Sequence, residues 1–141
     1  KNANGGAGFT EYNDGTIQFE TTQWSQGYYD NGKIWQTFTL PKGKYEMRIE
    51  VKNAANIGSG STNIHFAVAQ GESLPDNEEL EKSDIILSYL KFESEHTNKT
   101  SALPIFELTE EKTITVGWVV SFSDICRNIE FKSVRLWSVA E

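Results

Sequence analysis

The sequence is poor in cysteine, in long apolar runs and in positive charge. Cys126 stands alone, so one chain can form neither an internal disulfide nor a thiolate metal cluster. No stretch approaches the roughly 20 apolar residues that a membrane-spanning helix needs. Acidic residues outnumber lysine and arginine by 20 to 13, which gives a net charge of −7. Because such a surface repels phosphate backbones and no basic patch offsets it, nucleic acid is excluded as a partner.

Catalytic and metal-binding motifs are also missing. The sequence contains no HxH, HExxH, GxSxG or EF-hand pattern. His65 falls in the middle of a strand-like run and His96 in a polar segment, whereas a glycosidase would need two carboxylates facing one cleft. The nearest carboxylates for that role are Glu93, Glu95 and Asp124. We therefore expect no enzyme, no cofactor and no metal site, although a structural calcium held by scattered loop oxygens stays open.

What the sequence does contain is apolar alternation with a period of two. In the segment 44–52, Tyr45, Met47, Ile49 and Val51 alternate with charged residues, as in a strand with one buried and one wet face. Eight segments are strand-like: 16–20, 33–40, 44–52, 63–69, 85–92, 101–108, 112–122 and 128–137. This pattern predicts an all-β fold, an antiparallel β-sandwich or jelly roll of about eight strands.

The last of these segments changes its facing. Ile129 and Phe131 share one parity, but Val134 and Leu136 fall on the other. One extra residue in a strand switches the facing of everything after it. The sequence therefore predicts a β-bulge near residues 132–133.

Proline and glycine mark where the segments end. Pro41-Lys42-Gly43 predicts a tight hairpin, and residues 109–112 predict a second short turn. Pro104 makes 101–108 an edge strand or one interrupted by a bulge. Pro75 opens a stretch, 73–84, that has the composition for a single helical turn. Gln36 interrupts the apolar stripe of 33–40 without an explanation in the sequence.

Successive strands that reverse direction would bring alternate connections to one end of the sandwich. These connections are 21–31, 53–62, 94–100 and 123–128, and the first of them carries three large rings. Trp and Tyr rings offer flat surfaces to the C–H face of a sugar, and nearby polar side chains can bind its hydroxyls. The predicted ligand-binding residues are Trp24, Tyr28, Tyr29, Asn56, Asp124 and Arg127.

Each of these residues also has a structural interpretation. Trp24 and one of Tyr28 and Tyr29 can fold back to anchor their own loop, and Asn56 can serve as a turn residue. Asp124 and Arg127 can pair with each other, a surface contact of little energetic consequence.

The stretch DNGKIWQTFTLPKGKYEMRIEV (30–51) resembles a pattern of galactose-binding-like jelly-roll domains in Bacteroidetes surface lipoproteins, some of them domains of unknown function. GESLPDNEELEKSD (71–84) and ITVGWVVSF (114–122) extend the resemblance over most of the chain from residue 16. Such domains are similar to carbohydrate-binding modules. The resemblance implies a glycan or polysaccharide partner, further domains of a longer parent protein, and a secreted or outer-membrane location. It carries no set of ligand-binding residues.

The expected organisation is one domain over residues 1–141, in which 1–15 form a poorly ordered or edge segment. KNANGGAGF has no apolar core of a signal peptide, so we expect a mature fragment or a domain of a longer protein. The predicted function is a non-catalytic module that binds glycan weakly at the loop end. The alternative is a structural or protein-interaction domain of a surface lipoprotein with no sugar site.

Overall fold

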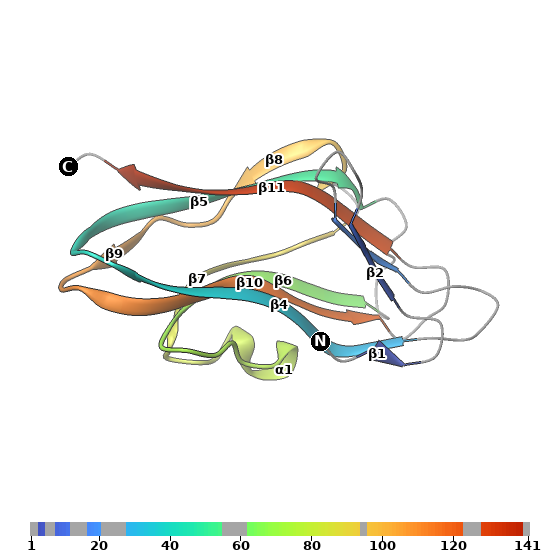
Figure 1. Cartoon of the computed structure of the whole chain (residues 1–141), viewed down its shortest axis with the longest axis horizontal. Helices are drawn as coiled ribbons and strands as arrows, with labels where there is room; N and C mark the ends of the chain where they lie inside the picture. Colours follow the sequence, from blue (N-terminus) through green and yellow to red (C-terminus); the bar gives the residue numbers. More distant parts are fainter. Residues whose placement is uncertain are drawn as a thin grey trace.

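The computed structural model describes residues 3–4, 8–11, 17–20, 28–54, 62–93, 96–122 and 128–139. Two antiparallel sheets pack face to face, and a single helical turn lies outside one of them (Figure 1). The predicted fold class, an all-β antiparallel sandwich, is confirmed.

We call the two sheets sheet A and sheet B, and their strands are ordered as follows. Sheet A has the order β1 (Ala3–Asn4), β4 (Tyr28–Leu40), β10 (Lys112–Phe122), β6 (Thr62–Gln70) and β7 (Ile86–Lys91). Sheet B has the order β2 (Gly8–Glu11), β3 (Ile17–Glu20), β11 (Asn128–Val139), β5 (Gly43–Asn53) and β8 (Lys99–Ala102), and β9 (Phe106–Leu108) also pairs with β5. The helical turn α1 spans Asn77–Leu80. All eight predicted segments are therefore strands, and the predicted single turn within 73–84 is confirmed.

The core between the sheets follows the alternation that the sequence shows. The inward residues of β5 and β10 are buried, among them Ile49 and Ile114, neither of which is exposed to solvent. Trp118 lies at the centre, where its ring stacks on Phe131 with the centroids 4.5 Å apart and meets Phe66 edge-on at 5.3 Å. Trp118 comes from sheet A and Phe131 from sheet B, so this contact joins the two layers.

Two predicted irregularities are confirmed. The register between β11 and β5 shifts between Phe131 and Ser133, which places Val134 and Leu136 against the core as a bulge requires. The segment 101–108 is broken between β8 and β9 around Pro104, and both halves pair with β5 at the edge of sheet B.

The predicted hairpin at Pro41-Lys42-Gly43 is wrong in its pairing. The chain does turn there, but β4 belongs to sheet A and β5 to sheet B, so the turn passes from one layer to the other. The hydroxyl of Tyr45 donates a 2.7 Å hydrogen bond to the Pro41 carbonyl and holds this crossing. The short turn after β9 also crosses between the sheets. Turn residues specify where the chain reverses, whereas the strand that it then pairs with depends on distant residues.

A second, smaller core lies on the outer face of sheet A, where the segment 71–85 with α1 packs against β6 and β10 (Figure 1). Leu74 and Leu80 are buried against Ala67, Ala69 and Val119. Small residues on β6 leave room for this segment, so β6 and β10 are buried on both faces. Within the described ranges, no helix has the length and hydropathy to span a membrane.

Candidate functional site

The strand ends that border the long connections lie at one end of the sandwich. Phe122, at the end of β10, pairs with Tyr29 at the start of β4 and with Thr62 at the start of β6. In sheet B, Asn128 at the start of β11 pairs with Glu20 at the end of β3. This arrangement of the strand ends agrees with the predicted alternation of direction.

The structure does not describe the side chains of the ligand-binding site that the sequence predicts at this end. Trp24, Asn56, Asp124 and Arg127 lie outside the described residues, and only the backbone of the two tyrosines is described. Tyr28 and Tyr29 begin β4, where they pair with β1. Sugar stacking at this end therefore stays a prediction.

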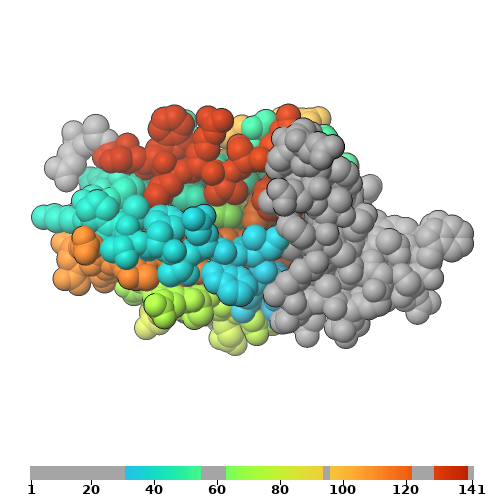
Figure 2. All heavy atoms as spheres, in the orientation of Figure 1, coloured from blue at the N-terminus to red at the C-terminus, as the bar shows by residue number. Residues whose placement is uncertain are grey.

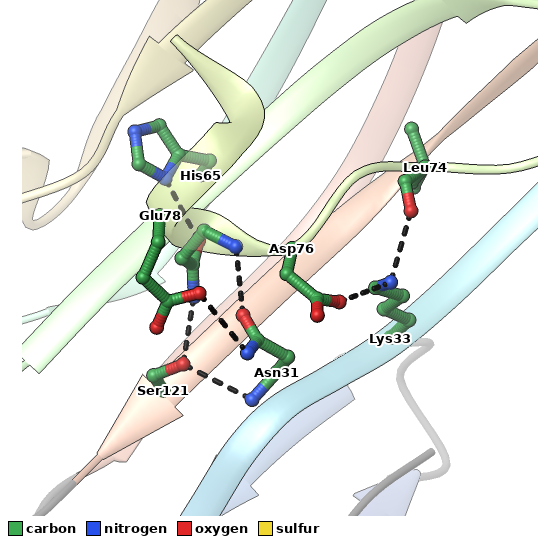
Figure 3. A network of polar contacts seen from close by, with 8 residues as sticks. Asn31, Lys33, His65, Leu74, Asp76, Glu78 and Ser121 are labelled. Atoms are coloured by element: carbon green, nitrogen blue, oxygen red, sulfur yellow. Dashed lines mark hydrogen bonds and ion pairs between the residues drawn. The ribbon is translucent and has the colours of Figure 1, made fainter. Parts of the chain in front are cut away.

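A polar network fastens α1 to sheet A (Figure 3). Its hub is Asn77, whose side-chain amide donates to the Asn63 carbonyl at 2.9 Å and to Ser121 Oγ at 2.8 Å. The backbone N–H of Asn77 donates to Asn31 Oδ1 at 2.7 Å. The Asn77 Oδ1 atom lies 2.8 Å from His65 Nδ1. Because both amide hydrogens of Asn77 are used elsewhere, His65 carries its proton on Nδ1 and donates it to Asn77.

His65 is therefore a buried structural residue and not a free base. Its Nε2 atom has no hydrogen-bond partner within the described part of the chain and lies 3.8 Å from a carboxylate oxygen of Glu81. Burial lowers the pKa of His65, although the bond to Asn77 and the charge of Glu81 act in the opposite direction. Ser121 Oγ accepts hydrogen bonds from Asn77 and from the Asn31 N–H and does not contact His65. This geometry gives no support to a hydrolase.

The network also includes an ion pair at its exposed side. Lys33 donates to Asp76 Oδ1 at 2.7 Å and to the Leu74 carbonyl at 2.9 Å (Figure 3). Among the described residues, no three or more His, Cys, Asp or Glu side chains are grouped so as to hold a metal ion.

A different arrangement occupies the outer face of sheet B. A hollow of about 180 Å³ lies over β5, β8 and β11, and we call it the sheet B groove. It is smaller than the roughly 300–1,000 Å³ pockets that enclose drug-sized ligands. Its lining side chains are Arg48, Glu50, Thr100, Ser133, Arg135 and Trp137.

The strand register explains how distant residues meet in the sheet B groove. Glu46 pairs with Trp137, and Arg48 pairs with Arg135 in the next row of the same face. Glu50 forms the third row with Ser133 of β11 on one side and Thr100 of β8 on the other. Three rows therefore follow one another along this face. The first contains an aromatic ring, the second two guanidinium groups, and the third a carboxylate with hydroxyls.

Trp137 is the aromatic element of the sheet B groove, and 46% of it is exposed. The Arg48 Cζ atom lies over the indole, 5.4 Å from the ring centroid. The Arg48 Nε atom donates a 2.6 Å hydrogen bond to Glu46, which fixes the guanidinium beside the ring. A cation over the π face stabilises the orientation of the indole by about 0.5–1 kcal/mol at an exposed site. The ring is therefore held in place although much of it faces solvent.

The remaining groups of the groove offer hydrogen bonds. Ser133 Oγ donates to Glu50 Oε2 at 3.3 Å, and Thr100 is exposed beside them. Arg135 is exposed and forms no ion pair with another described residue. This set of a flat ring, a carboxylate, hydroxyls and a guanidinium matches what a sugar ring presents.

Sequence reasoning missed the sheet B groove, although one signal for it was available. The predicted bulge that turns Val134 and Leu136 inward also turns Arg135 and Trp137 outward. What the sequence does not show is that β11 lies beside β5, because the paired residues are separated by some 90 positions along the chain.

A second hollow, of about 190 Å³, opens between the edges of β4 and β11, on the side that Figure 2 faces. Its walls are mainly apolar, with Ile34, Phe66 and Trp118 among them. Gln36 lies at this opening and is exposed, which explains why a polar residue interrupts the inward stripe of β4. With Gln36 as the main hydroxyl-binding side chain, this cleft is less suited to a sugar than the sheet B groove.

Known structures share this fold. The Emp47p carbohydrate recognition domain gives a TM-score of 0.53 at 11% identity and covers 99% of this chain and 90% of that one. TmCBM61 in complex with β-1,4-galactotriose gives 0.51 at 11% identity, with 97% and 87% covered. Xylanase10C from Cellvibrio japonicus in complex with xylopentaose gives 0.50 at 14% identity, with 99% of this chain but 27% of the xylanase covered. At these identities the similarity shows a sandwich fold shared with carbohydrate-binding modules.

The sequence itself identifies a family. No curated protein matches the chain. Residues 1–117 match the family described as a domain of unknown function, DUF5013. Since this match spans well over half of the 141 residues, the chain belongs to the DUF5013 family.

Proposed function

We propose that this domain is a non-catalytic glycan-binding module and that the sheet B groove contacts the sugar. The observation that carries the proposal is Trp137, a solvent-exposed indole that Arg48 holds in place beside hydrogen-bonding groups. A pyranose ring stacked on the indole buries its C–H face, while Glu50 and Arg135 bind its hydroxyls. The shared fold with carbohydrate-binding modules supports the same class of ligand.

The groove also favours binding over bond cleavage. Its face carries the carboxylates of Glu46 and Glu50, four residues apart on one strand. At about 3.3 Å per residue their backbones are separated by about 13 Å. Glycosidase carboxylates face each other about 5–9.5 Å apart across one cleft, whereas Glu46 and Glu50 follow one another along the same strand and do not face each other across the groove. In addition, Glu46 is held in an ion pair with Arg48.

A shallow groove with one stacking ring implies weak binding. A single aromatic contact and a few exposed hydrogen bonds give affinities in the micromolar to millimolar range, about −8 to −4 kcal/mol. Such affinity suits a module that keeps a larger protein near a polysaccharide, where several weak contacts add.

Calorimetric titration with oligosaccharides, after a glycan-array screen, tests the proposal. We expect Trp137→Ala to weaken binding by at least about tenfold, because the stacking surface is lost. Trp35→Ala is the matched control, since Trp35 is also a half-exposed indole, 53% accessible, but lies on β4 of the other sheet. Equal affinity of wild type and Trp137→Ala would show that the sheet B groove does not contact the sugar. No binding to any glycan would favour the structural or interaction domain instead.

The loop end of the sandwich is a second location for glycan contact. Its support is the ring-bearing sequence 21–31 and the meeting of the bordering strand ends. The side chains that we propose there are Trp24, Tyr28, Tyr29, Asn56, Asp124 and Arg127. In the same titrations, loss of affinity in Trp24→Ala and Tyr28→Ala would assign binding to this end, and unchanged affinity would exclude it.

We also propose that the domain works in a secreted or cell-surface bacterial protein, as part of a longer chain of the lipoprotein type. The support is the sequence resemblance over 30–51 together with the glycan-binding proposal, since polysaccharide ligands occur mainly outside cells. Fractionation of cells that express the full-length parent protein, with protease treatment of intact cells, tests this location. Protection from the protease would contradict it.

A further inference from the structure

We propose that the sheet B groove selects glycans that bear carboxylates, such as uronic acid residues. This inference rests on the proposed glycan-binding function and deepens it. Its basis is the pair Arg48 and Arg135, which occupy directly opposite positions on neighbouring antiparallel strands. Like charges directly opposite each other on a sheet are destabilising, so a fold tolerates them where an anion offsets the repulsion.

Only one of the two arginines has a carboxylate among the described residues that neutralises its charge. Arg48 has Glu46 as its ion-pair partner at 2.6 Å and also contacts the indole of Trp137. Arg135 has no ion pair with any residue that the structure describes. A protein with a net charge of −7 has ample carboxylates for its cations, so an exposed guanidinium inside a groove stands out. Arg135 is therefore the group that an anionic ligand would bind.

The order of the rows sets the position of the ligand. Trp137 and Arg135 are two residues apart on β11 and point to the same face, so their Cα atoms are separated by about 6.6 Å. A pyranose ring stacked on the indole face that Arg48 leaves uncovered then has a substituent within reach of the Arg135 side chain. A guanidinium binds a planar carboxylate through two parallel N–H···O bonds, a geometry that a neutral hydroxymethyl group cannot use.

The flanking acids restrict which anions fit. Glu46 and Glu50 lie in the rows on either side of the arginines and repel a dense polyanion. A single carboxylate seated in the middle row avoids both, provided that the carboxylates of the neighbouring sugar rings point away from this face. The groove thus favours a uronate-containing glycan over a nucleic acid or a highly sulfated chain.

The test is calorimetric titration of the intact domain, at low ionic strength, with oligogalacturonate and with neutral β-1,4-galactan oligosaccharides of the same length. We expect wild type to bind the uronate at least about tenfold more tightly, and Arg135→Gln to lose about that factor for the uronate alone. Arg135→Lys keeps the charge but not the planar fork and should retain only part of the preference. The matched control is Lys132→Gln, which removes a positive charge from β11 outside the groove.

The outcomes separate the inference from the function it rests on. Equal affinity for neutral and uronate oligosaccharides overturns uronate selection and leaves glycan binding in place. If Arg135→Gln and Lys132→Gln weaken uronate binding equally, the attraction is one of general charge and the inference fails. If wild type binds neither oligosaccharide, the glycan-binding proposal itself fails. Circular dichroism of each variant establishes that a loss of binding is not a loss of folding.

Discussion

Arg48 of β5 and Arg135 of β11 stand directly opposite each other on the outer face of sheet B, with an acidic residue two positions along β5 on either side. Only Arg48 has one of these acids, Glu46, as its partner. The other acid, Glu50, accepts a hydrogen bond from Ser133 instead. The face therefore contains a cation without an ion-pair partner in the described part of the chain, Arg135, and a carboxylate that opposes anion binding, Glu50. Each of the two can be substituted without altering the other.

Glu50→Gln should strengthen binding of oligogalacturonate about threefold at low ionic strength. The substitution removes a negative charge that lies next to the arginine row, while the amide oxygen can still accept from Ser133. The gain should shrink towards zero as salt is raised to about 0.5 M, because exposed charges are then screened. Calorimetry at two salt concentrations measures both effects. Weaker uronate binding by Glu50→Gln would contradict the assigned position of the carboxylate.

The packing of α1 on sheet A depends on Asn77, whose side chain is buried and makes three hydrogen bonds. Asn77→Ala should lower the free energy of unfolding by about 3 kcal/mol, because the Asn63 carbonyl and His65 Nδ1 lose their partner inside the protein. Urea denaturation measures this change. The control is Glu79→Ala in the same helical turn, which is exposed and should change the free energy by less than about 0.5 kcal/mol.

Gly117 allows β10 to approach β4 closely. A Cβ atom at this position would lie 2.1 Å from the Ile34 carbonyl oxygen and 2.7 Å from the Trp35 Cα atom. Both are backbone atoms of a paired strand, so Gly117→Ala should destabilise the fold by about 3 kcal/mol or more. Gly71→Ala offers a comparison: its added Cβ would meet nothing within 4 Å, but its φ of +102° carries the usual strain. There we expect about 1 kcal/mol. Thermal denaturation of both variants should rank them in this order, and the reverse order would contradict the close approach.

Much of this fold can be predicted from the sequence, because most strands have one solvent-exposed and one buried face and therefore alternate polar with apolar residues. The alternation in 44–52 correctly predicted the buried residues of β5, and the change of parity between Phe131 and Val134 correctly predicted the bulge. Gln36 and His65 were harder to interpret, since their surroundings come from distant segments. Gln36 lies at an open edge, and His65 is covered by α1.

The candidate site was less predictable for the same reason. Arg48 and Arg135 lie side by side only because β5 pairs with β11, and no local sequence pattern specifies that pairing. The turn at Pro41 shows this limit as well, because its residues fit both a hairpin and a crossing between sheets. The aromatic residues of the sequence direct attention to the loop around Trp24, while nothing in the sequence pattern singles out Trp137 in the final strand.

The buried imidazole of His65 should make stability depend on pH. Burial holds the pKa of His65 below its ordinary value of 6.5, and the nearby charge of Lys91 adds to this, although Asn77 and Glu81 oppose it. The unfolded chain therefore takes up a proton near pH 6.5 while the folded protein resists it, so the free energy of unfolding falls as pH decreases below about 6.5. The slope from one such group is at most about 1.4 kcal/mol per pH unit. Urea denaturation between pH 8 and pH 5 should show the decline.

His65→Asn isolates this contribution, because its amide can still donate to Asn77 while it has no proton to gain. The variant should be less stable at pH 8, since it loses the packing of the ring on Tyr89. Its stability should, however, change much less between pH 8 and pH 5 than that of wild type. A His65→Asn variant with an unchanged slope would show that another group is responsible for the loss of stability in acid.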